Sequence, residues 1–424
     1  MSRAEADRLR QRLNNELQRL TLDECVKCTI CEQSCPVAGV TALFSGPKFV
    51  GPQAERFRHG ASVDLSVDYC SSCGTCTVVC PQGVHVAELN SLARAVLKAE
   101  RGVPLRDRLI TRTTLMGRAM TPVAPVANAV LDNRLARTAL EKVVGVHADA
   151  PMPTAHPEPL RAWLKRRPAP TRTPTRGPVV FFHGCAGGYF EVEAARCAIE
   201  VLEHLGFEVL VPEQGCCGLA EQSNGLFEQA TASVRKLVAQ LRAPATGVPI
   251  VSTAGSCGGM LKHEAHEILG LDDPGLLDVG ARTRDISEFL LELHDAGELP
   301  LDFARIDLRL PYHQPCQVRS QGIGVPAAEL LRLIPGLEVV ESDATCCGIA
   351  GTYGLKREKY AIAQAVGRPL FELVAATHQG LVACDTETCR WQIAKATGVR
   401  TVHPIQFVHQ AYGLGRVIAP SAVR

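Results

Sequence analysis

The sequence has few aromatic residues, almost no net charge and no long apolar helix. Aromatic residues make up 5% of its 424 residues, and 45 Lys and Arg nearly balance 44 Asp and Glu, which leaves a net charge of +1. Proteins that bind nucleic acid usually carry a basic field and aromatic stacking platforms, so no nucleic-acid partner is expected. At 46% hydrophobic and 21% charged residues, the composition excludes disordered and collagen-like chains and fits two or three folded domains.

The N-terminus lacks the apolar core of a secretory signal, because charged residues recur throughout MSRAEADRLRQRLNNELQRL. The longest uncharged run, Ala243 to Leu261, is interrupted by Pro, Ser and small residues around Cys257. It therefore predicts a buried strand that ends in a functional loop rather than a transmembrane helix. We expect a cytoplasmic protein, in which cysteines serve as thiols, metal ligands or catalytic groups more often than as disulfides.

The sequence is nevertheless rich in cysteine. It contains 18 cysteines, although a chain of this size does not need disulfides to fold. Eight lie between Cys25 and Cys80, and ten lie between Cys185 and Cys389. The first eight form two copies of Cys-x2-Cys-x2-Cys-x3-Cys-Pro, the spacing of bacterial-type ferredoxin [4Fe–4S] sites, where the fourth cysteine ligates the other cluster. The pattern predicts two [4Fe–4S] clusters, one on Cys25, Cys28, Cys31 and Cys80, the other on Cys70, Cys73, Cys76 and Cys35.

Zinc is the alternative metal, because Cys-x2-Cys pairs also build structural Zn²⁺ sites. Two such pairs suffice for zinc, however, and zinc does not explain eight cysteines in duplicate with Pro36 and Pro81 after each fourth cysteine. The spacing favours clusters that carry electrons over a zinc-stabilised scaffold that carries none.

Two further segments flank the ferredoxin-type motifs. Within residues 1–22, Leu9, Leu13, Leu17 and Leu20 follow a helical period, which predicts an amphipathic helix that packs on this chain or, alternatively, on another subunit or a membrane. Residues 101–177 form a basic, partly apolar connector, whose part from Arg101 to Arg176 carries +9 against −8 for the rest of the chain. Basic residues beside apolar ones suit an anionic membrane surface, and a connector that wraps the ferredoxin domain is the alternative.

The C-terminal half of the sequence repeats itself. Strand-like runs alternate with helical stretches at residues 191–205, 226–241, 327–333 and 357–375, and cysteines follow the runs. Three cysteine markers recur at offsets of 131, 130 and 132 residues: Cys185 and Cys316, Cys216 and Cys346, Cys257 and Cys389. The repeat predicts two tandem α/β domains with cysteines at the carboxyl ends of strands, where such sheets bind ligands.

Adjacent cysteines in each copy suit a shared polynuclear centre more than a disulfide with each other. The first site would comprise Cys185, Cys216, Cys217 and Cys257, and the second Cys316, Cys346, Cys347 and Cys389. Their alternative role is that of small buried hydrophobic residues, which the recurrence at matched positions disfavours. Cys197 has no counterpart and is expected to be buried. His183 and His313 precede the first cysteine of each copy, which suits a role beside the ligands or as a ligand.

From Cys25 onward the chain resembles a family of iron–sulfur proteins with two ferredoxin-type motifs and two cysteine-rich (CCG) domains, which includes a heterodisulfide reductase subunit. The resemblance rests on CVKCTICEQSCPV, GPKFVGPQAERFR, YCSSCGTCTVVCP, FFHGC, YHQPC, CCGIAGTYGLKREKY and ETCRWQI. CCGIAGTYG and ETCRWQI point to the branch of iron–sulfur subunits of anaerobic glycerol-3-phosphate dehydrogenase. The resemblance implies a helical two-cluster ferredoxin domain at residues 23–100 and CCG domains at 178–300 and 301–424.

The resemblance also implies a function. Proteins of this branch take electrons from a FAD-containing dehydrogenase subunit, pass them to menaquinone and help attach that partner to the cytoplasmic face of the inner membrane. No Gly-x-Gly-x-x-Gly follows a strand in this sequence, so substrate oxidation is expected on another chain. The alternatives are a heterodisulfide reductase-like thiol–disulfide oxidoreductase and an iron–sulfur subunit of another hydroxy-acid or succinate-type dehydrogenase.

One departure from the family pattern concerns the CCG domains. The family closes each with Cys-x2-Cys, but the first position of this pair is Ala254 in one copy and Thr386 in the other. Cys384 is the candidate substitute in the second copy. We therefore expect a further iron–sulfur cluster or another metal in these domains, without a full set of five thiolates in the first.

Overall fold

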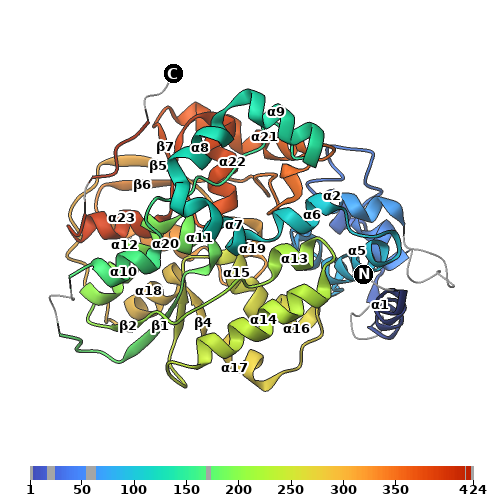
Figure 1. Cartoon of the computed structure of the whole chain (residues 1–424). Coiled ribbons are helices and arrows are strands. Elements are labelled where there is room, and N and C mark those ends of the chain that lie inside the picture. The colour runs from blue at the N-terminus through green and yellow to red at the C-terminus, as the bar shows by residue number, and fades with distance from the viewer. Residues whose placement is uncertain (1–2, 17–23, 54–63, 169–172, 416, 422–424) are drawn as a thin grey trace.

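The computed structural model describes residues 3–16, 24–53, 64–168, 173–415 and 417–421 (Figure 1). Within these residues the chain forms a helical N-terminal part, a helical connector and two parallel sheets with helices around them. The predicted order, a helical cysteine-rich domain followed by two tandem α/β domains, is confirmed.

The N-terminal part is organised around one long buried helix, α5 (Val86–Arg101). Helix α1 (Arg3–Glu16) packs against α5 through Leu9 and Leu13, which are buried in the same apolar core. The described part of the helix expected at residues 1–22 thus docks on the rest of the chain, and Leu17 and Leu20 lie outside the described residues. The shorter helices are α2 (Ile30–Gln33), η2 (Phe49–Gln53), η3 (Leu65–Tyr69) and α4 (Thr75–Val78).

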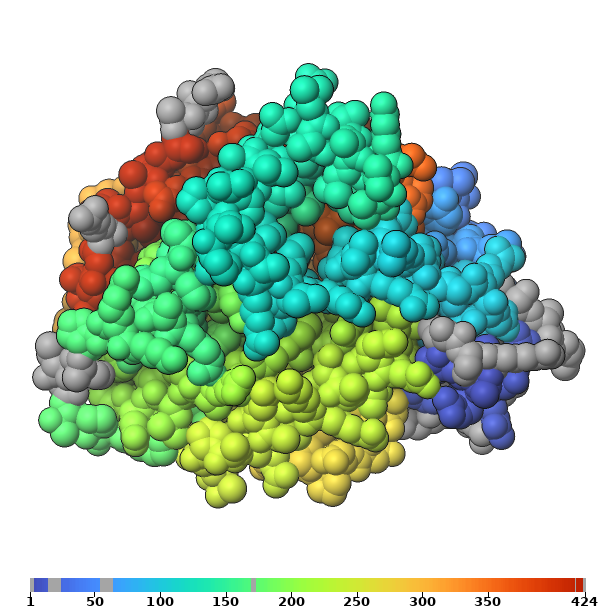
Figure 2. Space-filling view, in the orientation of Figure 1, coloured from blue at the N-terminus to red at the C-terminus, as the bar shows by residue number. Residues whose placement is uncertain are grey.

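The connector bridges the two sheet domains. Arg118 donates to the hydroxyl of Tyr189 in the first sheet domain at 3.2 Å, and Arg106 pairs with Glu358 of the second at 2.7 Å. The connector lies as a band across the face shown in Figure 2. Its helices are α6 (Leu105–Ile110), α7 (Thr113–Met120), η4 (Thr121–Val123), α8 (Ala124–Asp132), α9 (Arg134–Val144) and α10 (Leu160–Arg166).

Each sheet has four parallel strands, and the two sheets share one topology. The first has the order β2-β1-β3-β4 and the second β6-β5-β7-β8. Strands β1 and β7 are apolar and buried, as parallel strands covered on both faces must be. The strands are β1 (Pro178–Phe182), β2 (Glu208–Leu210), β3 (Ile250–Ser252), β4 (Thr283–Asp285), β5 (Leu308–His313), β6 (Leu337–Glu341), β7 (Leu381–Cys384) and β8 (Arg400–Val402).

The helices between these strands join the two sheet domains into one apolar core. Leu290 of α18, Leu331 of α20 and Val408 of α23 belong to the same buried cluster. In the first domain the helices are α11 (Gly184–Tyr189), α12 (Val192–His204), α13 (Leu219–Ser223), α14 (Phe227–Arg242), α15 (Gly255–Gly259), η5 (Met260–Glu264), α16 (Ala265–Glu267), α17 (Pro274–Arg282) and α18 (Ile286–Asp295). In the second they are α19 (Cys316–Arg319), α20 (Pro326–Arg332), η6 (Tyr353–Leu355), α21 (Tyr360–Thr377), α22 (Glu387–Thr397) and α23 (Pro404–Ala411).

The predicted helical stretches agree with α12, α14 and α20 to within one residue at each end. Helix α21 differs, because it begins at Tyr360 instead of residue 357. The residues before it make other backbone contacts instead, because Lys356 forms an isolated β-bridge with Val146 and Arg357 N donates to the carbonyl oxygen of Gly145 at 3.0 Å. The edge strands β4 and β8, which are only three residues long, were not predicted from the sequence.

The glycine of each Cys-Cys-Gly motif has a packing reason. Gly218 and Gly348 adopt φ values of +85° and +89°, a region that disfavours side chains. A Cβ atom at Gly218 would lie 2.9 Å from the carbonyl oxygen of Ala230 in α14, and one at Gly348 would overlap the carbonyl oxygen of Ala363 in α21. Both glycines therefore let the cysteine loop approach the following helix.

This predicts that Gly348→Ala is far more disruptive than Gly351→Ala. Both positions have positive φ, but nothing lies within 4 Å of a Cβ at Gly351. Backbone strain alone should cost about 1 kcal/mol at Gly351, whereas overlap with α21 should raise the cost at Gly348 to about 3 kcal/mol or more. Thermal unfolding under anaerobic conditions measures the difference, and equal melting temperatures for the two variants would contradict it.

Candidate functional site

The carboxyl ends of the two sheets face each other. At this junction Ser256 Oγ lies 3.5 Å from Thr386 Oγ1, and Gln321 Nε2 donates to the carbonyl oxygen of Gly255 at 2.8 Å. Open parallel sheets bind ligands beyond the carboxyl ends of their strands, at the point where the strand order reverses. That point lies between β1 and β3 in one sheet and between β5 and β7 in the other. The duplicated cysteines lie on this side of both sheets.

The first CCG group gathers from three strand ends. Cys185 lies in α11 after β1, Cys216 and Cys217 follow β2, and Cys257 lies in α15 after β3. The Sγ atoms of Cys217 and Cys257 are 3.1 Å apart, and the thiol of Cys185 interacts with Cys216. From the connector, Thr113 Oγ1 reaches to 3.9 Å from Cys216 Sγ. The structure thus brings the four predicted ligands of the first site together.

The second CCG group gathers in the same way. Cys316 begins α19 after β5, and its Sγ lies 4.0 Å from that of Cys346. Cys347, Cys384 and Cys389 share one buried cluster, and Cys384 interacts with Cys389. Cys384, at the end of β7, therefore lies beside the other cysteines of this group, as a substitute for the missing ligand at Thr386 must.

In each copy, the first cysteine of Cys-Cys-Gly has a pKa well below its ordinary value. Hydrogen bonds from neighbouring thiols are the main cause, and the glycine N–H adds another. Gly218 N lies 3.4 Å from Cys216 Sγ, and Gly348 N lies 3.3 Å from Cys346 Sγ. Buried sulfurs grouped around one stabilised thiolate fit a cationic centre that takes up thiolate charge.

His183 and His313 are both buried beside these groups. His183 Nδ1 lies 2.5 Å from the carbonyl oxygen of Gly184, and both ring nitrogens of His313 lack a hydrogen-bond partner among the described residues. Burial lowers the pKa of each histidine to about 4, so both rings are neutral at pH 7. Their predicted role near the clusters stays a prediction. Cys197, as expected, is buried in the apolar core on α12.

The two ferredoxin-type motifs have matching backbones. Lys27 and Ser72 occupy equivalent positions with φ of +59° and +55°, and Thr29 and Gly74 do so with φ of +68° and +78°. Left-handed backbone costs a non-glycine residue about 1 kcal/mol or more, so its recurrence points to a functional constraint on these loops. The loops also direct N–H groups at sulfur, as in the 3.4 Å contact from Ser72 N to Cys70 Sγ.

The eight N-terminal cysteines separate into two groups in space. Burial, with smaller contributions from Cys73 and Cys70, raises the pKa of Cys35 to about 12, which places Cys35 with the second motif. Burial also raises the pKa of Cys76, with contributions from Cys73, Cys70 and Cys35, so Cys76 completes this group. The other group lines a cavity of about 20 Å³ and consists of Cys25, Cys28, Cys31 and Cys80. The grouping matches the predicted exchange of the fourth cysteines, and the metal-binding role of each cysteine stays a prediction.

A cavity of about 140 Å³ lies between the second ferredoxin-type motif and the two CCG groups. Cys73 of the second ferredoxin-type motif lines it together with Cys316 of the second CCG group. The first CCG group lines it through Cys185, Cys216, Cys217 and Cys257. Most of the remaining wall is apolar and includes Ile110, Met116, Phe190, Leu219, Ile349, Leu355 and Trp391. Three groups of cysteines thus meet around one largely apolar space.

A buried charged network near Cys70, formed by α5 and the loop before α21, was not predicted from the sequence. Arg94 and Lys98 lie one helical turn apart on α5 and are both buried, although that helix is otherwise rich in Ala and Leu. Charged residues that interrupt the apolar face of a buried helix are the signal in the sequence that could have indicated it.

Comparisons with known proteins agree with this geometry. Residues 21–84 match the family profile of the 4Fe-4S dicluster domain, and residues 179–262 and 310–394 each match that of the cysteine-rich domain. The two CCG matches cover β1 to β3 and β5 to β7, which carry the duplicated cysteines.

Several curated proteins are similar over nearly the whole chain. One is a component of the anaerobic glycerol-3-phosphate dehydrogenase of Escherichia coli, which is 35% identical over 92% of this chain and 98% of its own length. The glycolate oxidase iron–sulfur subunit of Escherichia coli is 27% identical over 92% and 94%. A component of the dihydromethanophenazine:CoB–CoM heterodisulfide reductase of Methanosarcina barkeri is 24% identical over 94% and 96%. The chain therefore belongs to the family of this anaerobic glycerol-3-phosphate dehydrogenase component, iron–sulfur proteins that join a 4Fe-4S dicluster domain to two cysteine-rich domains.

Proposed function

We propose that this protein passes electrons from a FAD-containing glycerol-3-phosphate dehydrogenase subunit to menaquinone. The observation that carries the proposal is the shared cavity, where Cys73 meets Cys316 and the first CCG group. Iron–sulfur clusters, when bound, supply one-electron transfer. The cysteine groups would hold them in series, from the N-terminal domain to the facing edges of the sheets.

The assignment of ligands follows from the grouping of the sulfurs. One [4Fe–4S] cluster would be held by Cys25, Cys28, Cys31 and Cys80, and the other by Cys35, Cys70, Cys73 and Cys76. The first CCG site would use Cys185, Cys216, Cys217 and Cys257. The second would use Cys316, Cys346, Cys347, Cys384 and Cys389. In the CCG domains these sulfurs would hold a further iron–sulfur cluster or another metal, with His183 and His313 beside them.

The apolar cavity is the proposed place for the quinone. A quinone ring is flat and, apart from its two carbonyl oxygens, apolar, so walls such as Phe190, Ile349 and Trp391 suit it. Cys73 and Cys316 lie within the same lining. Helices α6 and α7 of the connector contribute Ile110, Thr113 and Met116 to this lining, so the cavity borders the connector.

The connector is also the proposed membrane-facing surface, on the cytoplasmic face of the inner membrane. None of the described helices combines the length and apolar character needed to cross a bilayer. Helices α6 to α9 nevertheless expose apolar side chains among the connector's basic residues, which suits an anionic lipid surface. These residues, called the connector ridge, are Leu105, Leu109, Leu115, Val126, Val130, Leu135 and Val143.

A thiol–disulfide oxidoreductase is the second candidate function. It is favoured by the 3.1 Å separation of Cys217 Sγ and Cys257 Sγ beside the cavity, and by the similarity to a protein named as part of a heterodisulfide reductase. Turnover of a disulfide by the isolated chain with a reduced dye would support this candidate. A flavoprotein for glycolate or another hydroxy acid that co-purifies with the chain would instead reassign the substrate of the complex.

Iron content tests the electron-transfer proposal. Protein purified without oxygen should contain about eight iron atoms or more per chain, and EPR of the reduced protein should show two interacting clusters, because eight cysteines serve two four-iron cubes. Zinc in place of iron would contradict the proposal and support the scaffold alternative.

The exchange of fourth cysteines predicts that Cys35→Ala and Cys25→Ala remove different clusters. Each variant should lose about four iron atoms and one EPR signal, because each deletes a ligand of one cube. Cys197→Ala is the matched control, since Cys197 is a buried apolar-core residue and should keep all iron. Loss of the same signal in both ligand variants would refute the exchanged assignment.

The connector ridge predicts a membrane-binding defect in the double variant Val126→Ser, Val130→Ser. These α8 side chains are 66% and 52% exposed, and each should lose about 1 kcal/mol of lipid burial, so the partition of the full chain onto vesicles of phosphatidylcholine and phosphatidylglycerol should fall at least roughly tenfold. Leu277→Ser on α17, at 51% exposure, is the control. If the double variant sediments with the vesicles as the wild type does, the connector ridge is not the membrane-binding surface.

A further inference from the structure

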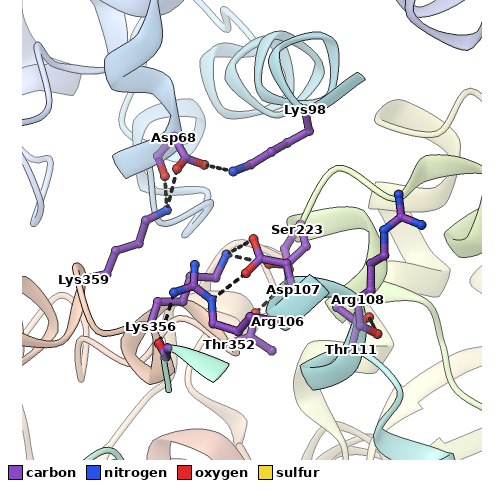
Figure 3. Close-up of polar contacts among 12 residues, drawn as sticks. Asp68, Lys98, Arg106, Asp107, Arg108, Thr111, Ser223, Thr352, Lys356 and Lys359 are labelled. Atoms are coloured by element: carbon purple, nitrogen blue, oxygen red, sulfur yellow. Dashed lines mark hydrogen bonds and ion pairs between the residues drawn. The ribbon is translucent and has the colours of Figure 1, made fainter. Parts of the chain in front are cut away.

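A buried network of charges lies where the N-terminal domain, the connector and both sheet domains meet (Figure 3). We call it the lysine network. Its members are Asp68, Arg94, Lys98, Arg106, Asp107, Lys356, Glu358 and Lys359.

Lys356 occupies the centre of this network. Its ammonium group donates to Asp107 of the connector and to Asn224 of the first sheet domain, both at 2.7 Å. Burial lowers the pKa of Lys356, and Asp107 opposes that shift. Lys356 itself belongs to the second sheet domain, so three parts of the chain meet at one ammonium group.

Lys359 extends the network to the second ferredoxin-type motif. Its ammonium group donates to the carbonyl oxygen of Asp68 and lies 3.4 Å from the Asp68 carboxylate, which also binds Lys98 at 2.7 Å. Lys359 Nζ lies 5.6 Å from the centre of the Tyr69 ring, the residue before Cys70. Lys359 is therefore held beside the start of that motif.

Arg94 contacts the motif itself. Its Nη1 donates to the carbonyl oxygen of Cys70 at 2.7 Å, and its Nη2 contacts Ser72 Oγ. Ser72 N in turn lies 3.4 Å from Cys70 Sγ. The guanidinium group thus contacts the backbone of Cys70, a proposed cluster ligand.

The network has more positive than negative charge. Its cations, Arg94, Lys98, Arg106, Lys356 and Lys359, outnumber its carboxylates, Asp68, Asp107 and Glu358. Lys356 and Lys359 are 4% and 2% exposed, and unbalanced buried cations are costly in free energy. A domain junction that served packing alone would be expected to balance its buried charges, so the excess requires an anionic neighbour. Burial lowers the pKa of Lys359 to about 7, and added negative charge at Cys70 would favour its ammonium form.

We propose that the lysine network raises the reduction potential of the cluster held by Cys35, Cys70, Cys73 and Cys76 above that of the other cubane cluster. The inference rests on the proposed ligand assignment. A cube on four thiolates is anionic and gains one further negative charge on reduction, so nearby buried cations stabilise its reduced form more than its oxidised form. The higher potential would place the electron on the cluster whose ligand Cys73 lines the shared cavity.

The cluster near Cys25 has a different electrostatic environment. Lys27 and Lys48 both line its cavity, and Lys48 lies 3.4 Å from Glu32, which gives that cation a carboxylate partner. Burial is the main cause of the raised pKa of both Cys31 and Cys76, and one carboxylate contributes in each case, Glu32 at Cys31 and Glu88 at Cys76. The buried cations beside Cys70, and not the carboxylates, are therefore what distinguishes the two environments. The contrast between the two environments predicts different midpoint potentials for the two clusters.

Redox titration of the full chain, followed by EPR, tests the proposal with Lys359→Met. The signal that Cys35→Ala abolishes identifies the cluster concerned. The midpoint reduction potential of that cluster should fall by about 59 mV. For a one-electron couple this corresponds to a tenfold lower ratio of reduced to oxidised cluster at a fixed potential. The other midpoint should stay unchanged. Lys359→Arg keeps the charge and should restore the wild-type value, and Lys236→Met on the exposed face of α14 is the control.

Unchanged midpoints in Lys359→Met with its iron retained would overturn the proposal, and so would equal shifts of both clusters. If Lys359→Met loses iron, Lys98→Met carries the same expectation, because Lys98 binds the same Asp68 from α5. Wild-type protein without two reducible signals would instead refute the ligand assignment, which separates failure of the proposed function from failure of this inference.

Discussion

The assembly of this protein depends on ammonium groups buried between its parts. Lys356 binds a carboxylate from the connector and an amide from the first sheet domain, and Lys359 binds Asp68 of the N-terminal domain. Apolar contacts alone could hold such parts together in several orientations, whereas hydrogen-bonded ammonium groups accept only a few geometries. These contacts help fix the facing edges of the sheets and the second ferredoxin-type motif around one cavity.

The same constraint links architecture to electron transfer. Two sheets of one topology direct their carboxyl ends at each other, so the first CCG group and Cys316 of the second line a common space. Cys73 reaches that space from the N-terminal domain. A net charge of +1 for the whole chain conceals a local arrangement in which cations gather beside Cys70 and along the connector. Charge placement, not total charge, is what the chemistry of an electron carrier requires.

Much of the fold could be predicted because cysteine spacing and strand periodicity are local patterns. The two N-terminal cysteine motifs and the tandem sheets followed from spacing, whereas the grouping of Cys384 with Cys389 was expected from the comparison with the family pattern. The lysine network could not be predicted in this way. Lys98 and Lys356 are 258 residues apart in the sequence, and only tertiary packing buries them near one carboxylate cluster. The three-residue edge strands β4 and β8 are likewise too short for a periodic signal.

We propose above that electrons reach quinone through this chain. The direct test mixes the anaerobically reduced complex of this chain and its flavoprotein partner with a menaquinone analogue, while absorbance of the iron–sulfur clusters is followed by stopped flow. We predict that the clusters are reoxidised at least as fast as the quinone is reduced in steady state. Quinone reduction that leaves the clusters reduced, or that proceeds equally well without this chain, would contradict the claim.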